Sequence, residues 1–144
     1  MKLISFIVPL LAALPAARSV LVQYDTVFDN PEASLNTVAC SDGKNGMVTK
    51  GYKTFGSLPS FPHIGAAIAV EGYNSVSCGS CWGLSYTSGK TTTTIYVLAI
   101  DRAVQGFVIA KTALEHLAGP QGVDAGKINV TATRVGGGLC GLKS

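Results

Sequence analysis

The sequence is poor in charged residues and, beyond its first 14 positions, in long hydrophobic runs. Only 13% of the 144 residues are charged. The nearest approach to a basic cluster is Lys44, Lys50 and Lys53, and these are spread over ten positions among glycines and Tyr52. Nucleic-acid-binding proteins need a denser basic patch, so we expect no nucleic-acid partner. No later stretch approaches the roughly 20 apolar residues of a transmembrane helix, so we expect no membrane span.

Histidine is also scarce, and the two histidines form no metal-binding pattern. His63 lies between Pro62 and Ile64, and His116 lies in a segment with helical periodicity. Neither has a second histidine, cysteine or acidic residue at the spacing of metal ligands. We therefore expect neither a metal nor a cofactor.

The N-terminus has the three-part pattern of a secretory signal peptide. Lys2 precedes an apolar run at 3–14, and small residues follow it. The run is too short to span a membrane, and its flanks are those of a cleaved leader. We place cleavage near Ser19 and predict a leader at 1–19, followed by one secreted domain at 20–144. That domain keeps nine basic and eight acidic residues, so it is almost neutral.

Four cysteines lie in the predicted mature domain, namely Cys40, Cys78, Cys81 and Cys140. In a secreted chain an even number indicates disulfides, and four cysteines allow three pairings. A bridge within the Cys-Gly-Ser-Cys segment would close a very small loop. A structural zinc site usually has two close cysteine pairs, and only one such pair occurs. We predict two structural disulfides, and the spacing leaves their pairing open.

Residues 78–83 read CGSCWG, which is similar to the signature around the nucleophilic cysteine of papain-like proteases. Such a protease needs a histidine and an asparagine roughly 130–150 residues downstream. Only 63 residues follow Cys81, and the only later histidine is His116. Ser75 occupies the place of the oxyanion-hole glutamine. Cys81 therefore has neither a base nor an oxyanion donor, and we exclude a protease. For Trp82 we favour packing in a small core over a role as a sugar-stacking platform.

Short apolar runs separated by turn residues predict a mainly β protein with few helices. We expect strands at 20–24, 35–40, 82–87, 91–100 and 127–135, and less clearly at 65–70. The β-branched run TTTTIYVLAI at 91–100 is typical of a central strand. One helix is expected at 110–118, where Gly119-Pro120 ends the helical pattern. With 17 glycines, the pattern favours a compact barrel over a layered α/β sheet.

Several motifs together resemble those of a known family. In order, they are Val-Gln-Tyr-Asp at 22–25, Val-Ala-Cys-Ser-Asp-Gly at 38–43, Gly46, Phe-Pro-His-Ile-Gly at 61–65, Ser-Cys-Gly-Ser-Cys-Trp at 77–82, Ile-Asp at 100–101, Gly-Phe at 106–107, Ala-Leu-Glu-His-Leu at 113–117 and Cys140. The combination resembles the cerato-platanin family of small secreted fungal proteins. The resemblance extends from about residue 20 to residue 141.

The resemblance implies a six-stranded double-psi β-barrel with short helices and with disulfides Cys40–Cys78 and Cys81–Cys140. It also implies secretion to the cell wall or medium and binding of chitin-type N-acetylglucosamine oligomers or other cell-wall polysaccharides. Expansin-like loosening without catalysis and plant-defence elicitation, through a plant surface receptor, are further expectations. Some members self-assemble at interfaces, which makes self-association another expectation.

Two acidic residues decide between a binding protein and an enzyme. The segment ending at Asp101 is similar to the His-Phe-Asp motif of related endoglucanases, but Ala99 and Ile100 replace its first two residues. Asp25 lies near the place of the general base in those enzymes. Inverting hydrolysis needs two carboxyl groups about 6.5–9.5 Å apart, one of them kept protonated. The alternative for Asp101 is a loop cap that hydrogen-bonds its own backbone, and we favour it less than a sugar contact or a relic acid. The alternative for Asp25 is a residue at a strand end that opens a turn, and this is the interpretation that we favour.

Loop residues supply further candidate contacts for a glycan. Asp42 lies in a turn sequence that borders the glycan groove in the family. Tyr52, Phe55 and Tyr73 lie in glycine-rich loops, where a ring can stack on a sugar or pack on the barrel, and we select Tyr52. Asn129 begins a glycosylation sequon inside a predicted strand.

We therefore predict a non-catalytic glycan-binding protein whose contacts are Asp101, Asp42, Tyr52 and Asp25. The alternatives are a weak inverting glycan hydrolase that uses Asp101 and Asp25, or a surface-active, self-assembling wall protein. The segment 102–105 departs from the serine- and glycine-rich loop expected after the aspartate, which weakens the transfer of sugar contacts around Asp101.

Overall fold

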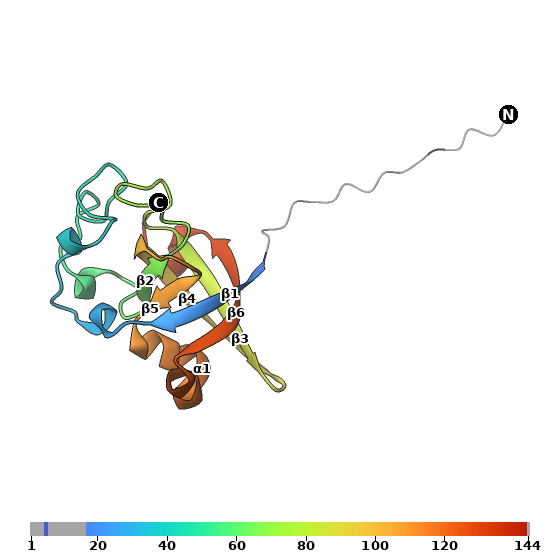
Figure 1. Ribbon diagram of the computed structural model, residues 1–144. Coiled ribbons are helices and arrows are strands. Elements are labelled where there is room, and N and C mark those ends of the chain that lie inside the picture. The colour runs from blue at the N-terminus through green and yellow to red at the C-terminus, as the bar shows by residue number, and fades with distance from the viewer. Residues whose placement is uncertain (1–4, 6–16, 144) are drawn as a thin grey trace.

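Six strands close into a barrel in the computed structural model, which describes residue 5 and residues 17–143 (Figure 1). Around the ring the order is β1-β5-β2-β4-β3-β6. The strands are β1 (Arg18–Tyr24), β2 (Ile64–Ala67), β3 (Cys81–Ser88), β4 (Thr91–Arg102), β5 (Phe107–Ile109) and β6 (Lys127–Val135). Two pairs, β1 with β5 and β2 with β4, are parallel, and the other four are antiparallel. The closed ring confirms the six-stranded barrel that the resemblance implies.

Helical segments are short and lie outside the ring. In the described range they are α1 (Lys111–Ala125) and four 3-10 turns, η1 (Thr26–Asp29), η2 (Leu35–Thr37), η3 (Phe55–Ser57) and η4 (Gly137–Cys140). In the part of the chain that the structure describes, no helix has the length and hydrophobicity needed to cross a bilayer. The apolar run of the predicted leader lies outside the described residues.

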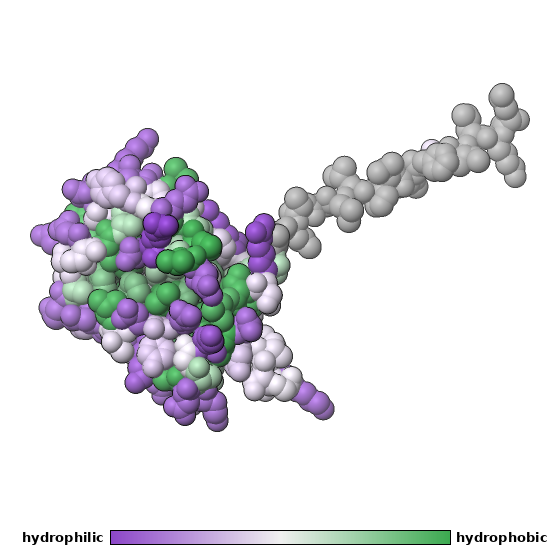
Figure 2. All heavy atoms as spheres, in the orientation of Figure 1, coloured by the Kyte–Doolittle hydropathy of each residue, from purple (hydrophilic) through white to green (hydrophobic). Residues whose placement is uncertain are grey.

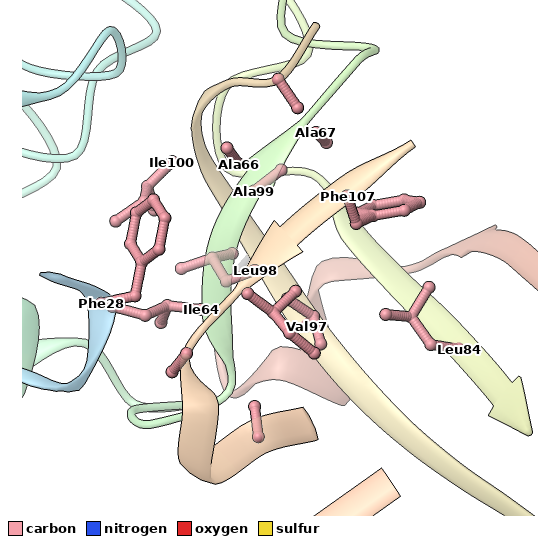
Figure 3. Close-up of a cluster of buried hydrophobic side chains, with 14 of the residues drawn as sticks. Phe28, Ile64, Ala66, Ala67, Leu84, Val97, Leu98, Ala99, Ile100 and Phe107 are labelled. Atoms are coloured by element: carbon pink, nitrogen blue, oxygen red, sulfur yellow. The ribbon is translucent and has the colours of Figure 1, made fainter. Parts of the chain in front are cut away.

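The longest strands follow the β-branched and alternating runs of the sequence. In β4 the four residues from Val97 to Ile100 are all buried. Consecutive buried residues require cover on both faces of a strand, and α1 packs against β4 on the outside of the barrel. Ile64 of β2 pairs with Leu98 of β4, and Figure 3 shows both residues in one buried cluster with Val97.

The predicted strand at 35–40 is wrong. The chain there forms η2 and then bends, because local side-chain hydrogen bonds outcompete a strand. The Ser34 hydroxyl accepts the Asn36 N–H at 3.1 Å, and the Thr37 hydroxyl donates to the Ser34 carbonyl at 2.6 Å. The predicted strand at 65–70 is shorter than expected, because the Val70 N–H closes a turn onto the Ala67 carbonyl.

The predicted helix at 110–118 is confirmed as the first part of α1. Gly119 has a φ of 70°, and Pro120 then begins a second helical segment within α1. The residue that precedes the helix, Ala110, has no capping side chain. Instead, the Asp29 carboxylate at the end of η1 accepts the N–H groups of Lys111 at 2.8 Å and Thr112 at 2.9 Å. An acidic group at this end also complements the helix dipole.

Both disulfides have the pairing that the resemblance implies. Cys40 is bonded to Cys78 with a Cα–Cα distance of 5.3 Å, and Cys81 is bonded to Cys140 at 5.8 Å. The first ties the loop before η3 to the segment before β3, and the second ties η4 to β3. All four cysteines are buried, and the described residues include no free thiol. The CGSCW segment is therefore structural.

One glycine in the β4–β5 connection allows β1 to approach closely. Gly106 has a φ of 51°, and a Cβ there would overlap the Leu21 carbonyl of β1. The Gly106 carbonyl accepts the Ile68 N–H at 3.0 Å, which fixes the end of β2 beside this connection. Any larger residue would be strained in this backbone conformation and would push β1 away.

Candidate functional site: two grooves

Two grooves of similar size open on the surface. The tyrosine groove, of about 470 Å³, is lined by Lys50, Tyr52, Gly137, Gly138, Leu142 and Lys143. The tryptophan groove, of about 490 Å³, is lined by Arg18, Val20, Ile68, Ala69, Trp82, Phe107, Ala132 and Arg134. Both volumes fall within the roughly 300–1,000 Å³ of small-ligand sites.

The tyrosine groove combines one aromatic ring with exposed backbone and two ammonium groups. Tyr52 is half-buried and ends a tight turn, in which its N–H donates to the Met47 carbonyl at 3.1 Å. Gly137 and Gly138 open η4 and carry no side chain that could cover their peptide groups. Partial burial lowers the pKa of Lys50 from its usual value. The groove therefore offers a flat apolar surface beside several hydrogen-bond donors.

Asp42 makes a polar pair with another loop residue. The Tyr73 hydroxyl donates to the Asp42 carboxylate at 2.8 Å, and both side chains are exposed. This hydrogen bond raises the pKa of Tyr73, because loss of the phenolic proton would also place two negative charges together. Asn74 holds the loop by accepting the Asn45 N–H at 2.8 Å. Neither Asp42 nor Tyr73 lines either groove.

The other two predicted acidic contacts hydrogen-bond to the backbone. Asp101 lies inside β4, and its carboxylate accepts the N–H groups of Ala39 at 3.0 Å and Arg102 at 2.9 Å. Asp25 accepts the Val27 N–H at 2.9 Å and caps η1. In the ring order, β1 and β4 are three positions apart, so the two acids belong to opposite sides of the barrel.

The structure does not connect the four predicted glycan contacts to one another. Within residues 17–143, no hydrogen bond joins any two of Asp25, Asp42, Tyr52 and Asp101. Of the four, Tyr52 alone lines either groove. Phe55, one of the two loop aromatics that we did not select, is buried and stacks on Phe28 at a centroid distance of 6.0 Å.

The Trp82 side chain packs against Phe107 and also lines the tryptophan groove. Its ring meets Phe107 edge-on at a centroid distance of 5.4 Å, and its indole N–H donates to the Ser80 hydroxyl at 2.8 Å. The guanidinium carbon of Arg134 lies 6.0 Å from the centroid of the indole ring. Sequence reasoning missed Phe107 and Arg134, because β5 and β6 bring them to Trp82 from distant parts of the chain.

The two histidines contact each other. His63 Nε2 lies 2.8 Å from His116 Nδ1, which links the segment before β2 to α1. Burial lowers the pKa of His63, and the charge of His116 lowers it further. The described residues contain no group of three or more metal-ligating side chains.

Comparisons with known proteins decide the family. The family model described as Cerato-platanin matches residues 20–142. The chain belongs to the cerato-platanin family. Over 136 residues it is 43% identical to the heat-stable 19 kDa antigen of Coccidioides immitis (strain RS), covering 94% of this chain and 90% of that protein. It is 32% identical to cerato-platanin of Ceratocystis fimbriata f. sp. platani over 120 residues, covering 83% and 84% of the two chains.

Solved structures agree with this assignment. Cerato-platanin 3 from M. perniciosa is 46% identical with a TM-score of 0.81, and the match covers 87% of this chain and 100% of that one. The solution structure of the fungal elicitor cerato-platanin is 32% identical with a TM-score of 0.74, covering 84% and 96%. Cerato-platanins are small secreted fungal proteins of the elicitor type, and this chain has their fold and both disulfides.

Proposed function

We propose that this cerato-platanin is a secreted, non-catalytic protein that binds chitin-type N-acetylglucosamine oligomers in the tyrosine groove and loosens wall polysaccharide as expansins do. The observation that carries the proposal is the Tyr52 ring in an open groove of about 470 Å³, beside two consecutive glycines. Family membership supports the secreted location.

The groove has the chemistry that a saccharide needs. A sugar ring presents an apolar C–H face and a rim of hydroxyl groups, so it stacks on an aromatic ring and hydrogen-bonds at its edges. Tyr52 supplies the ring, and the peptide groups of Gly137 and Gly138 can approach a ligand closely. Lys50 and Lys143 can donate to hydroxyl and acetamide oxygens. Asp42 lies outside the groove, and its exposed carboxylate would contribute a polar contact to the glycan from another loop.

The two candidate catalytic acids support binding more than hydrolysis. An inverting mechanism needs one carboxyl group kept protonated and another that activates a water molecule. Instead, Asp101 accepts the backbone N–H groups of Ala39 and Arg102, and Asp25 accepts that of Val27, so both carboxylates are engaged in holding the backbone. We expect no new reducing ends above a blank on chitin or cellulose. Release of sugar that disappears in Asp101→Asn would instead support the hydrolase alternative.

Calorimetry with chitotetraose tests the tyrosine groove. Tyr52→Ala removes the stacking surface, and we expect its affinity to fall about fivefold to tenfold, since an aromatic contact contributes up to about 1.5 kcal/mol. Tyr86→Ala is the matched control, because it removes another half-buried tyrosine, in β3, that does not line the groove. We expect its affinity to stay within twofold of the wild type. Equal affinities for wild type and Tyr52→Ala, with both proteins folded, would contradict the assignment.

Self-association together with elicitor activity is a second proposal, and it rests on a separate observation. Large apolar side chains are unusually exposed, with Ile68 at 56%, Val76 at 85% and Val104 at 88%. Such residues favour adsorption at interfaces and contact between copies. Light scattering and surface tension would test this, and a strictly monomeric, surface-inert protein would contradict it. Recognition by a plant surface receptor belongs to the same proposal, as the relative described as a fungal elicitor suggests.

A further inference from the structure

The tryptophan groove lies at one end of the barrel, where β1, β3 and β5 begin and β6 ends (Figure 1). Pairing of β3 with β6 sets Trp82 opposite Arg134, and the same end receives Phe107 from β5. The site is thus assembled on the rigid strands of the barrel, away from the loops that carry Tyr52. A ligand there would meet a preformed surface.

The walls of this groove are mostly apolar and offer few hydrogen-bonding groups. Val20, Ile68 and Ala132 are aliphatic, and the Trp82 indole N–H is already used by Ser80. A saccharide would lose hydrogen bonds between its hydroxyls and water without replacement, which is costly. Figure 2 shows hydrophobic residues gathered over the face on which β1 and β5 lie. The groove therefore fits a hydrocarbon chain better than a sugar.

Arg134 places a positive charge at this apolar groove. The Arg134 guanidinium has a Ser77 hydroxyl at 3.5 Å and the Trp82 ring at 6.0 Å, and no carboxylate in the described range hydrogen-bonds to it. Guanidinium is weakly hydrated and binds carboxylates through two parallel hydrogen bonds. Arg18 also lines the groove but falls within the predicted leader. Cleavage after Ser19 would leave the α-amino group of Val20 at the same groove, so Arg134 is the side-chain cation that the mature protein keeps there, beside that terminal amine.

We propose that the tryptophan groove binds an amphiphilic carboxylate of the fatty-acid type. Its hydrocarbon chain lies against Trp82, Phe107 and Ile68, and its carboxylate pairs with Arg134. The volume of about 490 Å³ suits a medium-length chain. The proposal goes beyond glycan binding and uses a different groove, so either one can fail without the other.

Trp82 is the only tryptophan in the chain, so fluorescence excited selectively at tryptophan, without the five tyrosines, reports on this groove. The experiment titrates the oxidised mature protein with decanoate and, separately, with the uncharged decan-1-ol, both below the concentrations at which they aggregate. We expect a saturable change in Trp82 fluorescence and at least fivefold tighter binding of decanoate. Each CH₂ removed from the carboxylate should weaken binding about fourfold while the chain remains buried.

Substitution at Arg134 tests the role of the charge. Arg134→Gln should lower the preference for decanoate at least about threefold and leave the affinity for decan-1-ol within twofold. Arg102→Gln is the matched control, because this exposed arginine ends β4 and does not line the groove. It should keep the wild-type preference. Circular dichroism verifies that each variant is folded.

Four outcomes would overturn the proposal. One is the absence of any saturable Trp82 response to decanoate in the folded wild type. Another is an unchanged preference in Arg134→Gln, which would assign the charge effect elsewhere. The third is displacement of decanoate by chitotetraose, which would assign the groove to glycans. The fourth is binding only to vesicles of phosphatidylcholine and phosphatidylglycerol, which would assign the groove to a lipid surface.

Discussion

Removal of the Cys81–Cys140 disulfide should cost a large share of the stability of the fold. The bond links β3 to η4 across 59 residues of sequence, and both half-cystines are at most 2% exposed. A cross-link of this span restricts the unfolded chain strongly. The change to test is the double substitution Cys81→Ala with Cys140→Ala, which breaks the bond without leaving a free thiol.

The loop length sets the expected magnitude. Loop-closure entropy for a span of this length corresponds to about 4 kcal/mol at 25 °C. Loss of two buried sulfur atoms adds to that figure, because the space they leave cannot fully collapse. A domain of this size is stable by only about 5–15 kcal/mol, so the variant should lie close to its folding threshold. The Cys40–Cys78 bond, with a separation of 38, should be worth nearly as much.

Denaturation in guanidinium chloride measures the effect, with fluorescence and circular dichroism as independent probes. We expect the free energy of unfolding to fall by at least about 4 kcal/mol, with a steeper dependence on denaturant, because the chain without the cross-link unfolds to a more expanded state. A fall of less than about 1 kcal/mol would refute the reasoning, since it would mean that the bond does not restrict the unfolded chain. An unchanged slope would show that the cross-link does not make the unfolded chain more compact.

Three further predictions rest on local geometry. Gly106→Ala should destabilise the fold by more than about 2 kcal/mol, because a Cβ there overlaps the backbone of β1, whereas Gly89→Ala, with a φ of 61° but open space, should cost about 1. Ultraviolet titration should show Tyr73 ionising above its usual pKa, and Asp42→Asn should remove that shift. Because the pKa of His63 is lowered in the folded state, the unfolded chain binds the proton more tightly. Stability should therefore fall as the pH drops below about 6.5, and His63→Asn should flatten this dependence in denaturation curves at pH 7.5 and 5.

The sequence predicts the long strands well, because their periodicity is itself a consequence of burial. The runs at 82–87, 91–100 and 127–135 all lie in strands of the barrel. By contrast, β5 has only three residues, too few to show a pattern, although Phe107 and Ile109 are buried. The run at 35–40 has apolar residues but begins after Ser34, whose hydroxyl captures a nearby N–H.

The sites were less predictable than the fold. Tyr52 could be selected, because a tyrosine in a glycine-rich loop is a local feature. The tryptophan groove could not, since Trp82, Phe107 and Arg134 come together only through the order of the strands. Asp25 and Asp101 are ambiguous for a different reason. The sequence around them is similar to that around catalytic acids, but a carboxylate that caps backbone N–H groups has the same local sequence pattern.

An NMR titration with N-acetylglucosamine oligomers of increasing length tests the proposed glycan groove most directly. The isotope-labelled, oxidised mature protein would be followed through its backbone amide signals. We expect saturable shifts at Tyr52, Gly137 and Gly138 that grow with oligomer length, and none at Trp82. An intact spectrum without any shift, or shifts confined to the tryptophan groove, would contradict the account.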